Sequence, residues 1–482
     1  MIQLSNYEII VPMDDTWYLL VNGLYCAFDV VDLEEGKALA EGKFEAIADE
    51  ERKRLLARGH LTESPENEIE DLRFMAGFYR KYYAESDLGL LILPTYDCNF
   101  RCPYCFERHR LSRGQEWLDK TMSKELVDAI FKAVEKEKER GVKANSCQLY
   151  GGEPFLEKNK DLVRYIAQKA KDAGMTLSAV TNGYDLDCFT DLLEEYPFEM
   201  LQITLDGVKE DNDRRRVYVG GGGSFEKILE NTILAVSKGI KVSIRVNTGT
   251  LNLEKVHLLK KVFEDRGLTQ YPEFDYYFAP TKGEADSDTN GGPGYREIVD
   301  TLIENGFEEK EAMEHVSHYS SYMSEIRRLI DKQEYYRPSD SHCGAEKMMY
   351  LVDPEGAIYT CWDFVAMEDK RVGRIDMDKE KFAFNFSLLQ WNFRNVLKMP
   401  KCMKCPYVFI CGGGCAACAY RETGNIADPY CGEVKEMFCD SAVEVCREAF
   451  YNKKERELTK SLKDLVLKYS NEERKRIMEK SK

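Results

Sequence analysis

Three cysteines within eight residues constrain this chain more than any other feature of its sequence. Cys98, Cys102 and Cys105 form the pattern CxxxCxxC, and Tyr104 precedes the last of them. Three closely spaced thiolates can bind three irons of a [4Fe–4S] cluster and leave the fourth iron open to a substrate or cofactor. The spacing therefore predicts a catalytic cluster, with a zinc knuckle or chance clustering as the alternative.

This spacing, with an aromatic residue before the last cysteine, resembles the signature of the radical S-adenosylmethionine (SAM) enzymes. In that family the open iron chelates SAM, and reduction releases a 5′-deoxyadenosyl radical. The resemblance implies that Cys98, Cys102 and Cys105 are both metal ligands and catalytic residues. It also implies an α/β fold built on a partial (β/α)6 barrel.

The composition agrees with metal binding. The chain has 16 cysteines among 482 residues, and its first residues lack the basic and apolar segments of a secretory signal. No apolar run is long enough to span a bilayer, so we expect no membrane partner. We therefore expect a cytoplasmic, oxygen-poor location in which the cysteines bind metal. The net charge of −17 argues against a nucleic-acid partner and permits a cationic peptide.

Strand-like and helix-like segments alternate between residues 86 and 285. Six βα units predict a parallel sheet with helices outside it. Each functional motif falls at the C-terminal end of a strand, which is where barrel active sites lie. The expected strands are 88–93, 147–150, 177–180, 201–205, 242–246 and 274–278.

The strand ends carry the SAM contacts that the resemblance implies. Gly-Gly-Glu-Pro at 151–154 matches the family's GGEP motif, in which glycines let the backbone approach the ligand and the glutamate pairs with the SAM ammonium. Thr-Leu-Asp-Gly at 204–207 resembles the family's (S/T)xDG motif. The arginine run 214–216 follows, and the resemblance implies that Arg216, or else Arg215, contacts the SAM carboxylate. The structural alternative is that the run forms a solvated face. The implied SAM-binding set is Tyr104, Gly151, Gly152, Glu153, Asn182, Thr204, Asp206 and Arg216.

Seven of the eight cysteines between residues 343 and 431 form a second block, and Cys418 has no assigned role. Their spacing follows C-x12-G-x4-C, then C-x2-C-x5-C-x3-C, with a last cysteine after a gap. This order resembles the SPASM pattern, which implies two more [4Fe–4S] clusters and three in all. A zinc ribbon is the alternative. The implied outer ligands are Cys402, Cys405, Cys411 and Cys431, and the implied inner ligands are Cys343, Cys361 and Cys415.

Two assignments in this block stay open. Cys439 is a rival to Cys431 as the last ligand. Asp363 lies two residues after Cys361, whereas sulfatase-maturing relatives place a catalytic aspartate directly after the matching cysteine. Asp363 is therefore either a catalytic base or a structural group.

The first 85 residues predict a separate module. Strands are expected at 7–12, 17–21 and 24–28, with Asn22-Gly23 suited to a type I′ hairpin turn. Helices are expected near 33–47, 46–58 and 66–84. A small sheet followed by three helices resembles the RiPP recognition element, a winged-helix-like module that binds a leader peptide as an extra strand. A structural extension packed on the barrel is the alternative.

The whole pattern resembles a radical SAM/SPASM peptide maturase that forms thioether links, as in sactipeptides and ranthipeptides. A precursor peptide with a leader sequence and an electron donor such as flavodoxin or ferredoxin are the implied partners. A carbon–carbon crosslinking maturase, a sulfatase-type formylglycine maturase and a zinc-ribbon binding protein are the rivals. The expected division is 1–85 for the peptide-binding module, 86–285 for the barrel, 286–340 for a bridging segment, 341–450 for the SPASM domain and 451–482 for a charged C-terminal helix.

Overall fold

The computed structural model describes residues 1–82, 87–105, 107, 113–281, 292–469 and 471–479. Contacts divide the chain into two compact units. We call them the terminal unit, which comprises Met1–Glu85, His318–Glu346 and Asn392–Lys482, and the barrel unit, which comprises Ser86–Ser317 and Lys347–Trp391. The division into five segments stays a prediction, and the first residues of its bridging segment lie outside the described residues.

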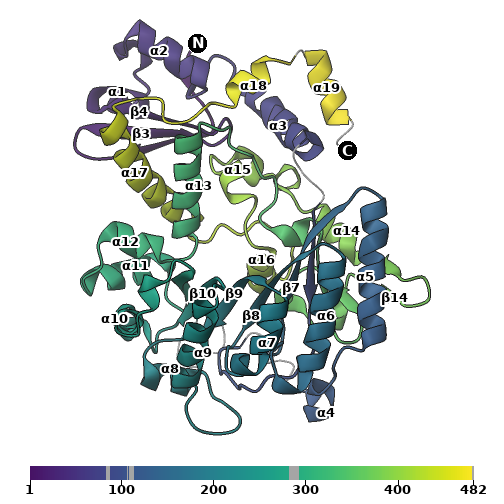
Figure 1. The fold of residues 1–482 in the computed structure, drawn as a ribbon. Helices are drawn as coiled ribbons and strands as arrows, with labels where there is room; N and C mark the ends of the chain where they lie inside the picture. The colour runs from purple at the N-terminus through teal and green to yellow at the C-terminus, as the bar shows by residue number, and fades with distance from the viewer. Residues whose placement is uncertain (83–86, 106, 108–112, 282–291, 470, 480–482) are drawn as a thin grey trace. The chain divides into compact units, whose positions relative to one another are not determined.

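Six parallel strands form the centre of the barrel unit, as the alternating pattern predicts (Figure 1). They stand in the order β11-β10-β9-β8-β7-β6. The strands are β6 Asp87–Ile92, β7 Lys143–Leu149, β8 Thr176–Thr181, β9 Phe198–Thr204, β10 Val242–Thr248 and β11 Phe274–Pro280. The helices of this part are α4 Gln115–Leu118, α5 Lys124–Glu139, α6 Lys160–Asp172, α7 Thr190–Glu195, α8 Lys209–Arg215, α9 Phe225–Ser237, α10 Leu258–Asp265, α11 Tyr295–Glu304 and α12 Glu309–Glu314.

Burial on both faces explains why these strands read as apolar runs. In β6 the consecutive side chains of Leu90, Leu91 and Ile92, which alternate between the two faces, are all buried. Helices cover such a sheet because parallel strands need long crossover connections. α5 shows the matching helix pattern: Ser123 accepts a hydrogen bond from the Leu126 amide at its start, and its apolar side chains are buried.

Four short strands extend this sheet beyond β6, and the sequence analysis did not predict them. β12 Met349–Val352 pairs in parallel with β6, and β13 Ala357–Tyr359, β14 Gly373–Asp376 and β15 Lys381–Phe384 follow as antiparallel neighbours. α14 Ser387–Asn392 comes next. Part of the segment expected to be a cysteine-rich domain thus completes the barrel sheet.

The N-terminal part of the terminal unit has the small sheet and three helices that the sequence predicts. Its antiparallel sheet has the order β2-β3-β4, and β1 pairs separately with β5. The elements are β1 Gln3–Leu4, β2 Glu8–Pro12, β3 Trp17–Asn22, β4 Ala27–Asp32, α1 Leu33–Ala40, α2 Asp49–Arg58, β5 Leu61–Thr62 and α3 Glu68–Tyr82.

The predicted type I′ turn at Asn22-Gly23 is wrong. β3 includes Asn22, and residues 23–26 form a longer connection to β4. The Asn22 Oδ1 atom accepts hydrogen bonds from the amides of Leu24 (3.1 Å) and Tyr25 (2.9 Å), which curls the chain after the strand. Cys26 completes the loop with a positive φ of 52°.

The C-terminal part of the chain is helical only in pieces. Residues 454–462 are not helical, although the charged tail was expected to form a helix. This segment instead pairs with the edge of β4. The helices of the later chain are α13 Tyr319–Lys332, α15 Val408–Cys411, α16 Ala416–Thr423, α17 Val434–Lys453, α18 Lys463–Leu467 and α19 Asn471–Glu479.

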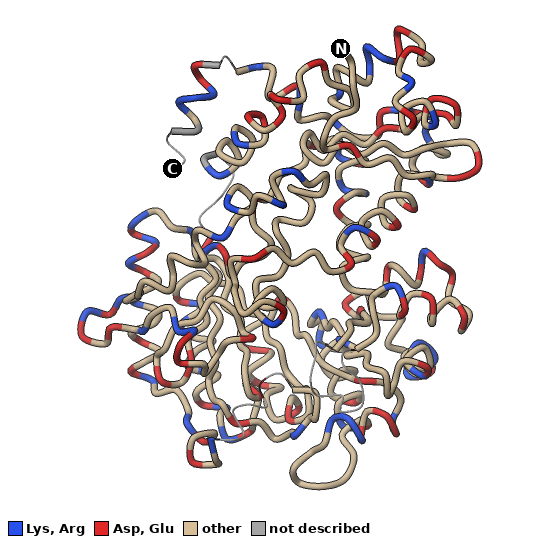
Figure 2. Tube along the Cα trace, turned by 180° about the vertical axis from the view of Figure 1, so that it is seen from behind, with Lys and Arg blue, Asp and Glu red and all other residues tan. Residues whose placement is uncertain are grey.

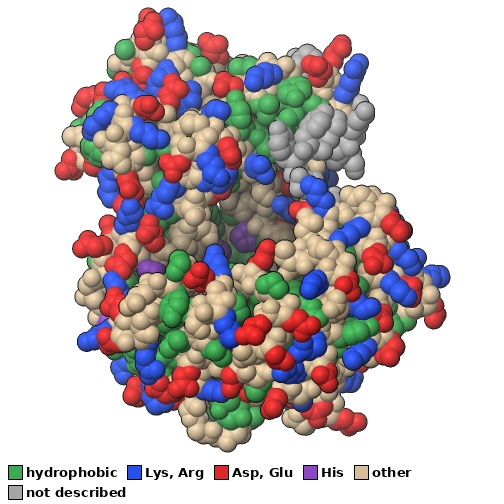
Figure 3. Space-filling model, viewed as in Figure 1, with side chains coloured by type: hydrophobic (Ala, Val, Ile, Leu, Met, Phe, Trp, Pro, Cys, Tyr) green, Lys and Arg blue, Asp and Glu red, His purple; other side chains and the backbone are tan. Residues whose placement is uncertain are grey.

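Charged side chains of both signs are distributed along both units. Figure 2 shows acidic and basic residues mixed along the trace, and the face of the barrel unit in Figure 3 carries both kinds side by side. Among the described residues, no helix has the length and apolar character needed to cross a membrane.

The β10 strand gives a test of this sheet. Ile244 is fully buried and lies opposite Ile203 of β9 and Tyr276 of β11. We expect Ile244→Ala to destabilise the barrel unit by about 3 kcal/mol, because it leaves a cavity. Leu258→Ala, at a side chain that is 41% exposed, is the control. Equal apparent melting temperatures of the two variants in a thermal scan would contradict the buried position of Ile244.

Candidate functional site

The first cysteine block lies in the loop that follows β6. The Cys105 amide donates to the Cys102 carbonyl at 3.2 Å, so the backbone between these two cysteines forms a tight turn. Burial raises the pKa of the Cys98 thiol, and the nearby charges of Glu153, Cys102 and Cys105 raise it further. Thiolates that repel one another in this way are stabilised by a bound metal, which deprotonates its thiol ligands. Three cysteine thiols are the ligand type that an iron–sulfur cluster takes, and this ligand set stays a prediction.

Two glycines after β7 let the backbone pass close to this cysteine loop. Gly151 and Gly152 have φ values of 78° and 51°, which favour glycine. A Cβ atom on Gly152 would lie 2.3 Å from the Asp97 carbonyl oxygen, and one on Gly151 would lie 2.4 Å from Leu93 Cγ. The Glu153 amide also donates to the Asp97 carbonyl at 2.8 Å. The two loops therefore pack directly on each other.

Glu153 is buried, and its carboxylate is held by three donors. Oε1 accepts from Thr181 Oγ1 (2.6 Å) and the Phe155 amide (2.8 Å), and Oε2 accepts from the Asn182 amide (2.6 Å). Burial raises the pKa of Glu153 to about 7 in spite of these hydrogen bonds. Glu153 thus joins the ends of β7 and β8, and its contact with the SAM ammonium stays a prediction.

Asn182 connects the β8 end to the cysteine loop. Its Nδ2 atom donates to Asn99 Oδ1 at 2.7 Å, one residue after Cys98. The sequence analysis did not single out Asn99, because a lone asparagine inside a cysteine motif gives no signal of its own.

The ends of β9 and β10 bring polar groups to the same side of the sheet. Thr204 is the last residue of β9, and Asp206 follows it fully buried. Asp206 Oδ1 accepts from the Asn247 amide at 3.2 Å. Two further asparagines that the sequence analysis missed fix the Asp206 backbone: Asn212 Oδ1 accepts from its amide (3.1 Å), and Asn252 donates to its carbonyl (2.5 Å).

Arg215 and Arg216 of the run after β9 are buried, so a solvated face is wrong for these two, whereas Arg214 is exposed. Arg216 Nη1 donates to the Tyr104 hydroxyl at 2.9 Å. The Arg215 guanidinium lies 4.8 Å from the centroid of the Tyr104 ring, and its Nε lies 3.6 Å from Asp206 Oδ2. Within the described part of the chain, the buried Nε of Arg216 has no hydrogen-bond acceptor. A buried cationic donor of this kind suits a carboxylate such as that of SAM.

The segment around Asp363 also lies in the barrel unit, in a short 3-10 turn. Trp362 is 40% exposed and stacks on Tyr150, with ring centroids 5.8 Å apart. Tyr150 directly precedes Gly151, so this aromatic pair places Cys361 and Asp363 in the same unit as the implied SAM contacts. A catalytic role for Asp363 stays a prediction.

Four cysteines of the second block line one pocket in the terminal unit. The lining also includes Tyr407, Tyr430 and Lys435, and Cys439 is not part of it. Instead, Cys439 Sγ lies 3.2 Å from the Tyr407 hydroxyl. Burial raises the pKa of the Cys402 and Cys411 thiols, and the neighbouring thiols raise it further. We call this the thiol pocket, and its cysteines are Cys402, Cys405, Cys411 and Cys431.

A buried ion pair that the sequence analysis missed ties together the loops around these cysteines. Arg394 forms an ion pair with Glu346, and both side chains are fully buried. Arg394 Nη2 donates to the carbonyls of Gly413 (3.2 Å) and Asp428 (3.0 Å). Glu346 Oε2 accepts from the Cys343 amide at 3.4 Å. No local pattern reveals this pair, because its members are far apart in the sequence.

The predicted inner set is divided between the units. Cys343 and Cys415 belong to the terminal unit, and Cys361 belongs to the barrel unit. Burial raises the pKa of Cys343 to about 11, with Glu346 and Cys415 among the groups that raise it further. Among the described residues, no group of three or more His, Cys, Asp or Glu side chains has the geometry to hold a metal ion. The ligand sets and the number of clusters therefore stay predictions.

Comparisons with known proteins identify the central domain. Residues 92–262 match the family model of the Radical SAM superfamily, so this chain carries a radical SAM domain, which implies a [4Fe–4S] cluster and SAM. A cysteine-type anaerobic sulfatase-maturating enzyme from Clostridium novyi (strain NT) is 23% identical over 366 residues, which cover 73% of this chain and 93% of that protein.

Two solved structures show the same fold. Native anSMEcpe with bound AdoMet has a TM-score of 0.56 at 20% identity and covers 76% of this chain and 98% of its own. Streptococcus suis SuiB bound to the precursor peptide SuiA has a TM-score of 0.51 at 14% identity and covers 89% of this chain and 98% of its own. The predicted fold class, with a radical SAM barrel and a cysteine-rich C-terminal part, is confirmed.

The cysteine loop can be tested by Cys98→Ala. We expect reductive cleavage of SAM to fall below detection and the iron content to drop by about four atoms per chain, because one of three protein ligands is lost. Cys147→Ala, at a buried thiol of β7 outside the loop, is the matched control. Chromatography of 5′-deoxyadenosine and an iron assay measure both effects. Unchanged cleavage by the Cys98 variant would remove this loop from the site.

The Arg394–Glu346 pair can be tested by Arg394→Met. We expect the terminal unit to lose about 3–5 kcal/mol of stability, because Glu346 is left as an unpaired buried charge. Iron binding should fall at the thiol pocket, while SAM cleavage at the first cysteine loop is retained in the folded fraction. Arg337→Met, at an exposed arginine of the same unit, is the control. Normal iron content and thermal stability in the Arg394 variant would contradict this role.

Proposed function

We propose that this chain is a radical SAM maturase that joins a cysteine sulfur of a ribosomally made precursor peptide to a carbon of an acceptor residue. The observation that carries this function is the second group of thiols: one chain combines a radical SAM cysteine loop with a pocket of four further cysteines. Thioether formation releases electrons as well as protons, and additional iron–sulfur clusters are suitable acceptors. SuiB, which covers 89% of this chain, binds a precursor peptide.

The first site would hold its cofactors through residues of the strand-end loops. Cys98, Cys102 and Cys105 would bind a [4Fe–4S] cluster. The loops around Glu153, Asp206 and Arg216 would bind SAM. The bound cluster and SAM would supply a 5′-deoxyadenosyl radical for hydrogen abstraction from the acceptor carbon. Arg216 offers a buried cationic donor for the SAM carboxylate, and Gly151 and Gly152 let the backbone approach.

The second cysteine block would hold the clusters that bind the substrate cysteine sulfur and accept the released electrons. The four residues of the thiol pocket would enclose an outer cluster, and Cys343, Cys361 and Cys415 would hold an inner one. No cysteine lies between Cys188 and Cys343, so the inner cluster would keep an open iron that could bind a substrate thiolate. A flavodoxin or ferredoxin would supply the reducing electrons, and residues 1–85 would bind the leader of the precursor.

A sulfatase-type formylglycine maturase is the second candidate. It is favoured by the sequence relatives, since a cysteine-type anaerobic sulfatase-maturating enzyme from Clostridium perfringens (strain ATCC 13124) is 26% identical over 377 residues. Both candidates act on a peptide cysteine and need the same first site. They differ in the product: a thioether keeps the cysteine sulfur in the peptide, and formylglycine loses it.

Mass spectrometry of a co-expressed precursor tests the function. The precursor is taken from a short cysteine-rich reading frame beside the gene, then reduced and alkylated. We expect loss of two hydrogens and of one alkylatable thiol per link. Loss of hydrogen with every thiol still alkylated would point to carbon–carbon crosslinks. Conversion of a cysteine in a sulfatase-derived peptide, with loss of sulfur, would support the formylglycine maturase.

The same assay tests the inner cysteine set. We expect Cys343→Ala to retain some SAM cleavage and to give no crosslinked product, because the substrate thiolate loses its binding position. Cys446→Ala, at a fully buried thiol of α17 outside both cysteine sets, should keep product formation. Full product formation by the Cys343 variant would exclude the inner set from the reaction.

A further inference from the structure

The outer edge of β4 is occupied by a segment of the chain's own C-terminal part. Glu457 forms an antiparallel bridge with Asp29. On either side of it the Val30 amide donates to the Arg456 carbonyl (2.8 Å), and the Leu458 amide donates to the Phe28 carbonyl (2.9 Å). We call residues 456–459 the tail strand. It takes the position at which an extended peptide would add to this sheet.

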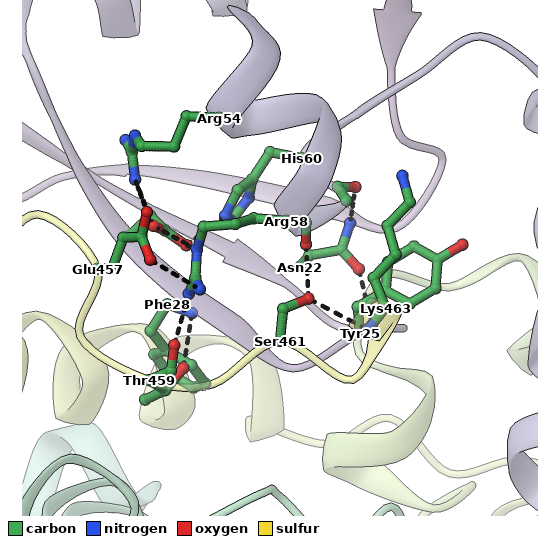
Figure 4. A network of polar contacts seen from close by, with 12 residues as sticks. Asn22, Tyr25, Phe28, Arg54, Arg58, His60, Glu457, Thr459, Ser461 and Lys463 are labelled. Carbon is green, nitrogen blue, oxygen red and sulfur yellow. Dashed lines mark hydrogen bonds and ion pairs between the residues drawn. The ribbon is translucent and has the colours of Figure 1, made fainter. Parts of the chain in front are cut away.

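Side chains of the tail strand complete the pairing. Thr459 Oγ1 accepts from the Phe28 amide at 3.0 Å and lies 3.3 Å from the Cys26 carbonyl, to which it donates. Arg58 Nη2 donates to the Thr459 carbonyl at 2.6 Å. Leu458 is 2% exposed and Thr459 is 3% exposed. Figure 4 shows Arg58 reaching from its helix to Glu457 and Thr459.

A buried charge network holds Arg58 in this position. Arg58 Nε lies 2.7 Å from Asp29, and His60 bridges Asp29 (2.6 Å) and Glu8 (2.8 Å). Burial lowers the pKa of His60, but Glu8 and Asp29 outweigh it and raise the pKa to about 9. Arg54 makes a further hydrogen bond to Asp29 at 2.6 Å. The donor of Arg58 is therefore fixed toward the β4 edge whichever peptide lies there.

The opposite edge of the sheet is poorly suited to strand addition. The Gly23 amide donates to the Tyr7 carbonyl, and the Met13 amide donates to the Trp17 carbonyl. The backbone N–H and C=O groups of the odd-numbered residues of β2 therefore point toward β3. Pro12 therefore falls on the outer side, where it has no N–H to donate. A peptide that extends this sheet is favoured at the β4 edge.

We propose that the β4 edge docks an extended segment of the precursor peptide, and that the tail strand fills this edge until the peptide displaces it. This inference rests on the function proposed above. The tail strand also defines the partner: an extended peptide with an aliphatic residue at the position of Leu458 and a serine or threonine at the position of Thr459.

The tail strand is short enough to leave without unfolding its neighbours. Two backbone hydrogen bonds and the contacts of Thr459 hold it on β4, and α17 and α18 flank it with buried residues of their own. Two of its ion-pairing side chains, Arg456 and Glu457, are 35% and 51% exposed, and exposed pairs contribute little stability. Occupation by the tail lowers the apparent affinity for the peptide by the fraction of molecules in which the edge is open.

Amide hydrogen exchange of the wild-type holoenzyme tests whether the peptide replaces the tail strand. The probe is the leader segment of the precursor that the enzyme modifies, added at a saturating concentration measured by fluorescence anisotropy. We expect the Leu458 amide to exchange at least about ten-fold faster with the peptide bound, while the Val30 amide stays protected by the new strand. Unchanged protection of Leu458 at saturation would overturn the proposal.

A variant gives a second, independent readout. We expect Leu458→Ala/Thr459→Ala to bind the leader about ten-fold more tightly, because it weakens the competing strand. Glu455→Ala, at an exposed residue just before the tail strand, should bind like the wild type. Unchanged or weaker binding by the double variant, with the folded state checked by thermal melting, would overturn the proposal.

Failure of the proposed function gives a different result. If no precursor is modified or bound, the probe becomes a labelled synthetic copy of residues 454–462. Binding of this copy to the double variant, and weaker binding to the wild type, would support an exchangeable edge whatever the natural peptide. Equal binding to both proteins, or binding to neither, would overturn it.

Discussion

The six parallel strands end at nearly the same level, and this arrangement determines where chemistry can occur in this chain. Ile92 of β6 pairs with Leu149 of β7, and Leu149 pairs with Ala179 of β8. Thr181 pairs with Ile203, so the ends of β8 and β9 also lie nearly level. Because the strands run in one direction, the residues that follow each of them emerge at one edge of the sheet. The cysteine loop, the glycine pair and the buried charges are all such residues.

Several charged side chains are buried together at that edge. Asp206, Arg215 and Arg216 are buried together around the Tyr104 ring. Burying charged groups costs free energy unless they are paired, so such a concentration is a frequent property of functional sites. Here the asparagines around Asp206 hold its backbone, and the arginines are held by an aromatic ring and its hydroxyl. The polar groups are thus fixed before any ligand binds, which lowers the cost of binding a charged cofactor.

Local patterns in the sequence predicted the features that local chemistry determines. Apolar runs such as 88–93 and alternating segments such as 242–246 predicted the six strands, and cysteine spacing predicted which thiols share a loop. The features that were missed depend on distant partners. β12 is short and forms because it pairs with β6, and the Asn22 side chain overrode the turn preference of Asn22-Gly23. Arg394 and Glu346 are ordinary charged residues until folding buries them together.

The core of the terminal unit also depends on residues that are distant in the sequence. Tyr7 and Phe74 from the N-terminal part pack in one apolar cluster with Phe409 and Leu462 from the C-terminal part. The Tyr7 hydroxyl donates to the Met403 carbonyl at 2.5 Å, next to Cys402 of the thiol pocket. The N-terminal sheet is therefore not a freely separable module. Excising it would expose this shared core and remove a support of the thiol pocket, because each buried aromatic or leucine side chain contributes roughly 1.5–3 kcal/mol. A peptide bound at the β4 edge would consequently lie on the same packed unit as the four cysteines of the thiol pocket.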